Sequence, residues 1–419
     1  MPSRASLAGR RALGRDGGVI PNPYLTGFLG LARMMNSVGG LPVLGPQMEA
    51  RVARDPADAD ALLDLSTLLF FTANPDMRSL ALDYQQRAFK LRQIYHLAPP
   101  ATTAFKLLVL MAPGDMTSNT PVDCLLEGAD ISVTLLYLLP GRPLPSPLPE
   151  HDVIFVAIGE SSANQILLRQ ISDLRTSSAG RVVNEPERIG RLTRDRVSEL
   201  LKSSPGAVMP ATVVADRQRL LAVQRLELSF DKIMDGGRFP IIIRPLDSQG
   251  GRGLVRIDSV QDLAPYLGKW LNQEFYISNF IDYRSPDGQF KKFRVVLIDG
   301  RPFACHLAIS SNWMIHYVNA DMDGSATKRQ EEERFFATFE QGFADTHSQS
   351  LRSLHDRIGL DYLAIDCAET PDGKLLVFEV DNAAIVHDFD DPALYPYKKP
   401  AMQKIFAAFR EMLLARAGA

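Results

Sequence analysis

Three carboxylates near the C-terminus have the spacing of a metal site. Asp366 closes one apolar run, and Glu379 and Asp381 lie two residues apart in the next. A Pro-Asp-Gly turn at 371–373 separates the runs, which predicts a β-hairpin with Asp366 opposite Glu379. Residues two apart point to the same face of a strand, so the three acids would share one surface. A hard cation such as Mg²⁺ would offset their repulsion; a hairpin whose acids simply face water is the alternative.

A glycine-rich segment farther upstream carries residues suited to hold phosphate. A strand expected at 239–245 includes Arg244, and a second strand is expected from residue 254. The loop between them contains Ser248, Gly250, Gly251, Arg252 and Gly253. Glycines allow consecutive backbone N–H groups to wrap an anion, and an arginine stands at each end of the loop. The loop lacks the ending of a Walker A motif and the helix that follows a Rossmann fingerprint. A plain glycine hairpin is the alternative.

Composition excludes several classes of function. The chain has 419 residues, enough for two or three domains, and a net charge of −3, which argues against nucleic-acid binding driven by overall charge. Cys124, Cys305 and Cys367 lie far apart without metal-ligand spacing, which favours a reducing, cytoplasmic setting. No apolar run reaches membrane-spanning length. The arginines before Asp16 are interpreted as a disordered basic tail, with an organelle transit peptide as the alternative.

The elements that must position these residues fall into three predicted parts. Residues 1–98 are expected to be helical and partly disordered, with helices at 61–71 and 77–96. Residues 99–186 alternate apolar strands with helices, which predicts a doubly wound parallel sheet. Residues 187–419 are expected to form the nucleotide-binding and catalytic part. The predicted fold class is therefore α/β.

The junction at residues 54–62 resembles that of a tetratricopeptide helical hairpin. Little more than one repeat is visible, whereas stacked arrays need at least three. We therefore expect a small helical appendage that packs on the next domain or on a second subunit. A homodimer is accordingly an open alternative.

From residue 182 onward the chain resembles the ATP-grasp superfamily, which includes D-alanine–D-alanine ligase, glutathione synthetase and ribosomal-protein glutamate ligases. The resemblance is carried, in chain order, by residues 182–187, 192–196, 205–212, 239–245, 248–253, 275–281, 292–300 and 363–382. It implies a fold in which a parallel-sheet domain precedes the ATP-grasp domains. It also implies ATP and Mg²⁺, with Mn²⁺ as an alternative ion, and an acyl-phosphate intermediate on the way to a carboxylate–amine bond.

The resemblance assigns roles to individual residues. The phosphates would be held by Arg196, Arg244 and the glycine-rich loop. The hinge whose backbone contacts adenine would be Ser278, Asn279, Phe280 and Ile281. Arg294 would stabilise the transferred phosphoryl charge. The metal ligands would be Asp366, Glu379 and Asp381.

Two departures from the family pattern stand out. Arginine occupies positions 196 and 244, where the family usually has lysine, and both residues carry the charge that phosphate needs. The family's metal motif usually ends Glu-x-Asn, whereas this chain has Glu379-Val380-Asp381 followed by Asn382. Whether Asp381 or Asn382 completes the metal site is left open, although strand alternation points Asn382 to the opposite face.

The acceptor substrate is expected near residues 306–320 and 386–392. His306 and His316 are candidate acid–base groups, with a structural strand histidine as the alternative for each. The partners would be ATP and a small carboxylate, amine or peptide. Two other hypotheses remain at this point: a small-molecule kinase on the same fold, and a nucleotide-binding interaction protein.

Overall fold

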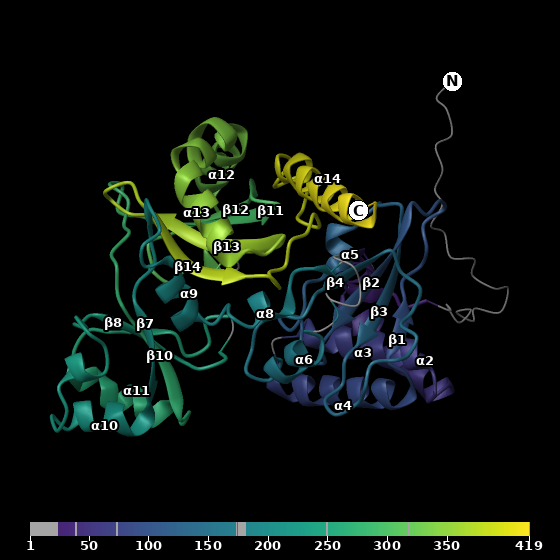
Figure 1. The fold of residues 1–419 in the computed structure, drawn as a ribbon, viewed down its shortest axis with the longest axis horizontal. Helices are drawn as coiled ribbons and strands as arrows, with labels where there is room; N and C mark the ends of the chain where they lie inside the picture. Colours follow the sequence, from purple (N-terminus) through teal and green to yellow (C-terminus); the bar gives the residue numbers. More distant parts are fainter. Residues whose placement is uncertain are drawn as a thin grey trace.

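The computed structural model describes residues 24–37, 40–72, 74–172, 174, 182–248, 250–316 and 319–418. The basic N-terminal segment, for which we expected a disordered tail or a transit peptide, lies outside the described residues. Within them the structure is mixed α/β, as expected, and contains three sheets (Figure 1).

The first sheet has the strand order β1-β3-β2-β4-β5. Its strands are β1 (Ile94–His96), β2 (Phe105–Met111), β3 (Ile131–Tyr137), β4 (Val153–Val156) and β5 (Val182–Val183). The last four are parallel, as predicted from the alternation of strands and helices. The short helices that connect or follow them are α5 (Val122–Leu125), α6 (Gln165–Gln170) and α8 (Pro186–Ile189). Residues 107–110 are buried on both faces, because helices cover both sides of the sheet.

Four helices precede this sheet: α1 (Gly27–Ser37), α2 (Leu41–Arg54), α3 (Ala59–Phe70) and α4 (Pro75–Leu91). Asp58 caps α3 by accepting a hydrogen bond from the Ala61 amide at 2.9 Å. Apolar residues of all four helices share one core with one face of the sheet. The helical segment therefore packs on the α/β sheet.

The end of this segment differs from the prediction. The second helix was expected to reach His96, but α4 ends at Leu91 and residues 94–96 form β1. Tyr95 is fully buried there and pairs with Leu135, so pairing with an open sheet edge overrides the helical spacing. The boundary expected at 98/99 consequently separates β1 from its own sheet.

The second sheet is antiparallel, with the order β7-β10-β8-β9. Its strands are β7 (Thr212–Asp216), β8 (Ile241–Pro245), β9 (Val255–Ile257) and β10 (Glu274–Asn279). It carries helices α10 (Arg217–Gln224) and α11 (Leu263–Lys269), with short 3₁₀ turns at Phe230–Lys232 and Val260–Asp262. Figure 1 shows this lobe at lower left, apart from the first sheet.

The third sheet has the order β12-β11-β13-β14-β6. Its strands are β6 (Ala207–Val208), β11 (Phe290–Ile298), β12 (Arg301–Ser310), β13 (Tyr362–Glu369) and β14 (Leu375–Asp381). The helices around it are α9 (Arg194–Leu201), α12 (Ala326–Thr338), α13 (Ser348–Ile358) and α14 (Lys398–Ala417), with a π-helical turn at Glu340–Ala344. Residues of α14 join the core that contains the N-terminal helices and the first sheet, so the chain's two ends help to form one core. Among the described residues, no helix combines the length and apolarity that a membrane crossing requires.

Candidate active site

A row of polar side chains crosses the third sheet. His306 on β12 pairs with Arg294 on β11, Arg294 pairs with Asp366 on β13, and Asp366 pairs with Glu379 on β14. The predicted hairpin and its Asp366–Glu379 register are thus confirmed. Lys292 lies two residues before Arg294 and shares its face of β11. Four neighbouring strands therefore present polar and charged side chains of both signs on one surface.

Asp366 is the centre of this row. Its carboxylate accepts hydrogen bonds from Lys292 Nζ at 2.8 Å and from Arg294 Nε and Nη2 at 2.7 and 3.1 Å. Burial by itself would raise the pKa of Asp366, but the two cations outweigh it and hold that pKa well below its usual range. The Asp366 carboxylate therefore stays ionised and fixes both cations in place.

Glu379 and Asp381 continue the acidic surface along β14. Glu379 forms an ion pair with Arg194 from α9. Burial and the charge of Glu379 raise the pKa of Asp381 to about 6, and its Oδ1 accepts from the Ala383 amide at 2.7 Å. Asn382 is buried on the other side, where its Nδ2 donates to the Ile158 carbonyl at 2.9 Å. Of the two candidates, only Asp381 therefore faces the other acids.

The carboxylates fit a divalent cation by donor type. Among the described residues, no three His, Cys, Asp or Glu side chains are already grouped to hold a metal ion, because Asp366 and Glu379 are engaged by cationic side chains. Within the described ranges no direct ion pair forms to Asp381, and the Arg294 charge that acts on it is already paired with Asp366. Hard carboxylate oxygens with unbalanced charge suit Mg²⁺. A metal on Glu379 would take the place of the Arg194 guanidinium.

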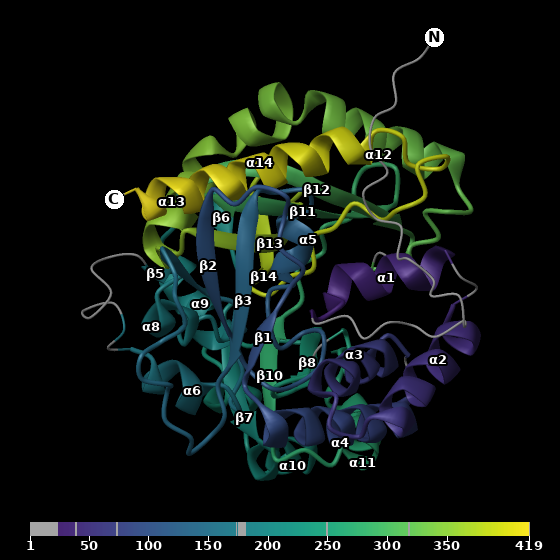
Figure 2. The ribbon, with the colours of Figure 1, turned by 90° about the vertical axis from the view of Figure 1, so that its right-hand side faces the viewer.

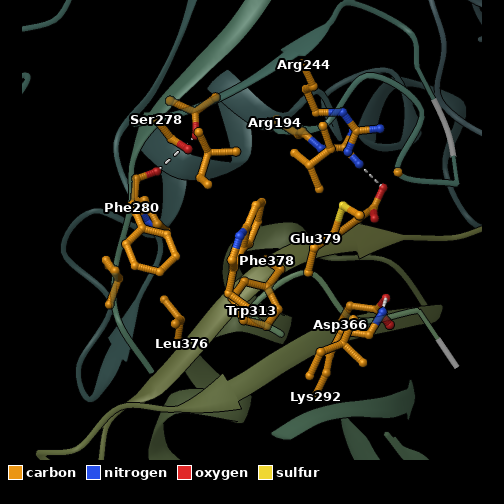
Figure 3. Close-up of a pocket in the computed structure, with 18 of the residues that line it drawn as sticks. Arg194, Arg244, Ser278, Phe280, Lys292, Trp313, Asp366, Leu376, Phe378 and Glu379 are labelled. Carbon is orange, nitrogen blue, oxygen red and sulfur yellow. Dashed lines mark hydrogen bonds and ion pairs between the residues drawn. The ribbon is translucent and has the colours of Figure 1, made fainter. Parts of the chain in front are cut away.

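A cavity of about 190 Å³ lies between the second and third sheets (Figure 3). One end is apolar and is lined by Phe280, Trp313 and Phe378; the other end is lined by charged side chains. The cations there are Arg194, Arg244 and Lys292, beside Asp366 and Glu379. The four predicted hinge residues, Ser278, Asn279, Phe280 and Ile281, all line this cavity.

A second cavity of about 250 Å³ adjoins the charged end. The two cavities share Arg194, Lys292, Asp366 and Glu379 among their lining residues. The second cavity extends to Asp381, Arg294, His306 and Glu160. Burial raises the pKa of Glu160, which follows β4, to about 7. Together the cavities connect an apolar slot with a chamber that contains both cations and carboxylates.

The glycine-rich loop contributes only part of what was expected. Gly250 and Gly251 line the first cavity, whereas Ser248, Arg252 and Gly253 do not. Ser248 instead fixes Arg244, whose Nε donates to the Ser248 hydroxyl at 3.0 Å. The Arg252 guanidinium lies 5.9 Å from the centroid of the Trp270 ring.

Two of the loop's glycines are required by close contacts. Gly251 has φ +71°, and a Cβ there would lie 2.1 Å from His316 Nε2. Gly253 has φ +70°, and a Cβ would lie 2.6 Å from Pro245 Cδ. The loop tip therefore lies directly against the segment that carries Trp313 and His316.

Arg196 is not in the cavity. It is exposed, and its Nη1 donates to the Gly190 carbonyl at 3.2 Å; Arg194 occupies the position expected for it. Residues two apart on a helix point to nearly opposite sides. Arg194 has the same phase as the buried residues Val197 and Leu201, so the helical spacing was a signal that could have identified it.

Sequence reasoning also missed Lys292, Glu160 and the role of Trp313 as a wall of the apolar slot. The signal for Lys292 was its spacing of two from Arg294 on one strand. Glu160 carries no local signal, because only the position of β4 brings it to the chamber.

The two candidate acid–base histidines have lowered pKa values. Burial, followed by the charge of Arg294, lowers the pKa of His306 well below its usual value, so its imidazole is neutral near pH 7. Burial also lowers the pKa of His316.

Comparisons with known proteins find similarity in structure only. No family model matches the chain, and no curated protein matches it. The D-alanine–D-alanine ligase of Bacillus anthracis is 13% identical, with a TM-score of 0.46 over 75% of this chain and 97% of its own. The VanG D-Ala:D-Ser ligase of Enterococcus faecalis is 13% identical, with a TM-score of 0.47 over 75% of this chain and 99% of its own.

A RimK domain ATP-grasp protein from Sphaerobacter thermophilus is 15% identical, with a TM-score of 0.42 over 74% of this chain and 99% of its own. It is named as an ATP-grasp protein, the superfamily that the sequence resembles. At such identities and TM-scores, these likenesses assign neither a family nor an activity to this chain. The tetratricopeptide resemblance is not confirmed.

Proposed function

We propose that this protein is an ATP-dependent ligase that joins a carboxylate to an amine through an acyl phosphate. The observation that carries the proposal is the cavity whose apolar slot leads to three cations and to the row of charges on the third sheet. A nucleoside triphosphate has the same division into an apolar, planar end and an anionic end.

The nucleotide would lie along this division. Its base would occupy the slot between Phe280, Trp313 and Phe378, beside the hinge residues at the end of β10. Its phosphates would reach Arg194 and Arg244, whose guanidinium groups can each hold phosphate oxygens with two N–H groups. The pKa of Arg244 is lowered to about 10 by burial and by the neighbouring Arg194, so both groups remain charged near pH 7 and together favour an anion.

Glu379 and Asp381 would hold Mg²⁺, or Mn²⁺ in its place, with Asp366 as the third carboxylate. When bound, the ion would neutralise charge on the phosphate oxygens. Asp366 already holds Lys292 and Arg294, so its contribution to the ion would be shared with those two cations. We assign it a double role as a metal ligand and as the anchor that positions the Arg294 guanidinium.

The reaction would proceed in two balanced steps. A carboxylate oxygen attacks the γ-phosphorus, an O–P bond forms, the bond to the β-phosphate oxygen breaks, and ADP leaves. The lone pair of an amine then attacks the acyl carbon, the bond to phosphate breaks, and the amine loses a proton. Arg294 would stabilise the charge on the phosphoryl group that is transferred.

The test is an incubation of the full chain with ATP, Mg²⁺, and pools of carboxylic acids and amines. A ligase gives equal amounts of ADP and phosphate and an amide of the expected mass. With hydroxylamine in place of the amine, the acyl phosphate is converted to a hydroxamate. ADP without phosphate release would instead support a kinase, and nucleotide binding without turnover would support an interaction protein; either result overturns the proposal.

A further inference from the structure

A third cavity, of about 420 Å³, lies on the far side of Arg294 from the nucleotide cavity. Arg294, His306 and Ile385 line both this cavity and the chamber that contains Asp381. Its remaining walls come from α1, from residues that follow β14, from the first turn of α14, and from Phe71, Met116 and Cys305. Figure 2 shows α1 beside α5 and close to α3.

Most of the walls are apolar. Phe28, Met35, Phe71, Met116 and Phe389 line the cavity, and the Phe389 ring stacks on His387 at a centroid distance of 3.6 Å. A cavity of this size and composition suits a ligand with an apolar body of roughly ten non-hydrogen atoms.

Carboxylates fix the position of α1, so this wall is preformed. Asp64 accepts hydrogen bonds from the Thr26 amide at 3.0 and 3.1 Å and from the Gly27 amide at 3.2 Å. Asp123 accepts from the Leu29 amide at 2.7 Å. Anions at the first amides of a helix stabilise that end of it.

The charged groups around the cavity select the ligand's polar end. Asp390 is already paired with Lys398, at 3.1 Å. Arg294 lies at the junction with the chamber, where its Nη1 makes only a long contact of 3.4 Å with the Ile385 carbonyl. Burial lowers the pKa of His387, and the pKa of His306 is lowered as well, so both imidazoles are neutral near pH 7. Because Asp366 already holds Arg294 Nε and Nη2, Nη1 is the Arg294 group left to donate at the junction, and an N–H donor there suits a carboxylate oxygen rather than an ammonium group.

We propose that this cavity binds a carboxylic acid with an apolar, aromatic-sized body, with its carboxylate at Arg294 and its body against α1. Its use as the acyl substrate rests on the ligase function proposed above; its binding does not. Under this assignment the N-terminal helix is part of the substrate site, although the sequence suggested only an appendage.

Met34 and Met35 offer a matched pair for the test. Both are half-buried on α1 and pack against the same core, but only Met35 lines the cavity. Binding of hydrocinnamate and of hydrocinnamyl alcohol to the full chain without ATP would be measured by calorimetry. The two probes have the same apolar body and differ in the carboxylate.

Hydrocinnamate is expected to bind, and to bind at least about tenfold more tightly than the alcohol. Met35→Trp is expected to weaken hydrocinnamate binding at least about tenfold by filling the cavity, and Met34→Trp to change it less than about twofold. Absence of binding, equal binding of acid and alcohol, or equal effects of the two variants would overturn the proposal. The comparison of acid with alcohol uses the unaltered chain, so it holds even where Met35→Trp prevents folding.

Formation of ADP and hydroxamate separates this proposal from the ligase function. Hydrocinnamate binding that responds to Met35→Trp, without any ADP or hydroxamate, would support the cavity and overturn the ligase. ADP formation with carboxylic acids that Met35→Trp leaves unchanged would support the ligase and overturn the cavity assignment.

Discussion

Arg194 offers the sharpest test of the nucleotide site, because the chain provides its own control. Arg194→Met removes a guanidinium that lines the cavity and pairs with Glu379, while Met keeps much of the length of the side chain. Arg196→Met removes the same charge from the same helix at an exposed position. Both variants change the net charge of the protein equally.

The expected loss follows from the contacts. A hydrogen bond to a charged group contributes about 1.5–3 kcal/mol when its partner is lost. In the protein without nucleotide, Arg194 already pairs with Glu379, and the two side chains are 17% and 29% exposed. Breaking such a partly exposed pair costs up to about 1 kcal/mol, which offsets part of the gain on phosphate binding. With the full offset the net loss is about 0.5–2 kcal/mol, or about two- to thirtyfold in the Kd for ATP.

Calorimetric titration with a non-hydrolysable ATP analogue and Mg²⁺ would measure this change. Arg196→Met should bind within about twofold of the unaltered chain, and the free energy of unfolding of Arg194→Met should fall by no more than about 1 kcal/mol. Tight binding by Arg194→Met, or an equal loss in Arg196→Met, would refute the assignment of α9 to the phosphate site.

Three further predictions concern the loop, the charged row and the N-terminal helix. Gly251→Ala should raise the KM for ATP about fivefold or more, because its Cβ would lie 2.1 Å from His316 Nε2. Gly250→Ala is the control for backbone strain alone, because Gly250 also has a positive φ, +59°, but a Cβ there would meet no atom within 4 Å. Asp366→Asn should abolish turnover and also lower the free energy of unfolding by about 3 kcal/mol, since it leaves two buried cations unpaired; an unchanged urea midpoint would contradict this. Burial raises the pKa of Asp64 in the folded protein to about 7, from an ordinary value of 3.8. Because the folded-state pKa lies above the unfolded-state pKa, the free energy of unfolding should fall as pH rises from about 4 to about 7 and then level off. Urea titrations at about pH 5 and about pH 8 should show this difference in the unaltered chain and a smaller one in Asp64→Asn.

The stability loss expected for Asp366→Asn follows from contacts that the sequence alone does not reveal. The hairpin itself was predictable, because its turn and its apolar runs are contiguous in the chain. The partners of Asp366 are Lys292 and Arg294, which lie 74 and 72 residues away. Which strand lies beside β13 depends on the order of the whole sheet, and no local pattern encodes it.

The glycine-rich loop shows that local sequence patterns also fail to predict which of its own residues reach the cavity. Its glycines and flanking arginines were visible, but the structure directs Arg252 to Trp270 and leaves Gly250 and Gly251 at the cavity. The choice between Arg194 and Arg196 was within reach of the sequence, because the buried face of α9 repeats at helical spacing. Motif matching alone selected the wrong member of that pair for the cavity.

The sequence by itself determined local units such as the acidic hairpin with Asp366 opposite Glu379 and the strand that carries Arg244. Each depends on residues a few positions apart, where turn chemistry and side-chain periodicity act directly. Only the tertiary structure decided which charges meet. Arg194 reaches Glu379 across 185 residues, and α1 becomes a wall beside Arg294, because packing of separate elements around shared cores brings them together.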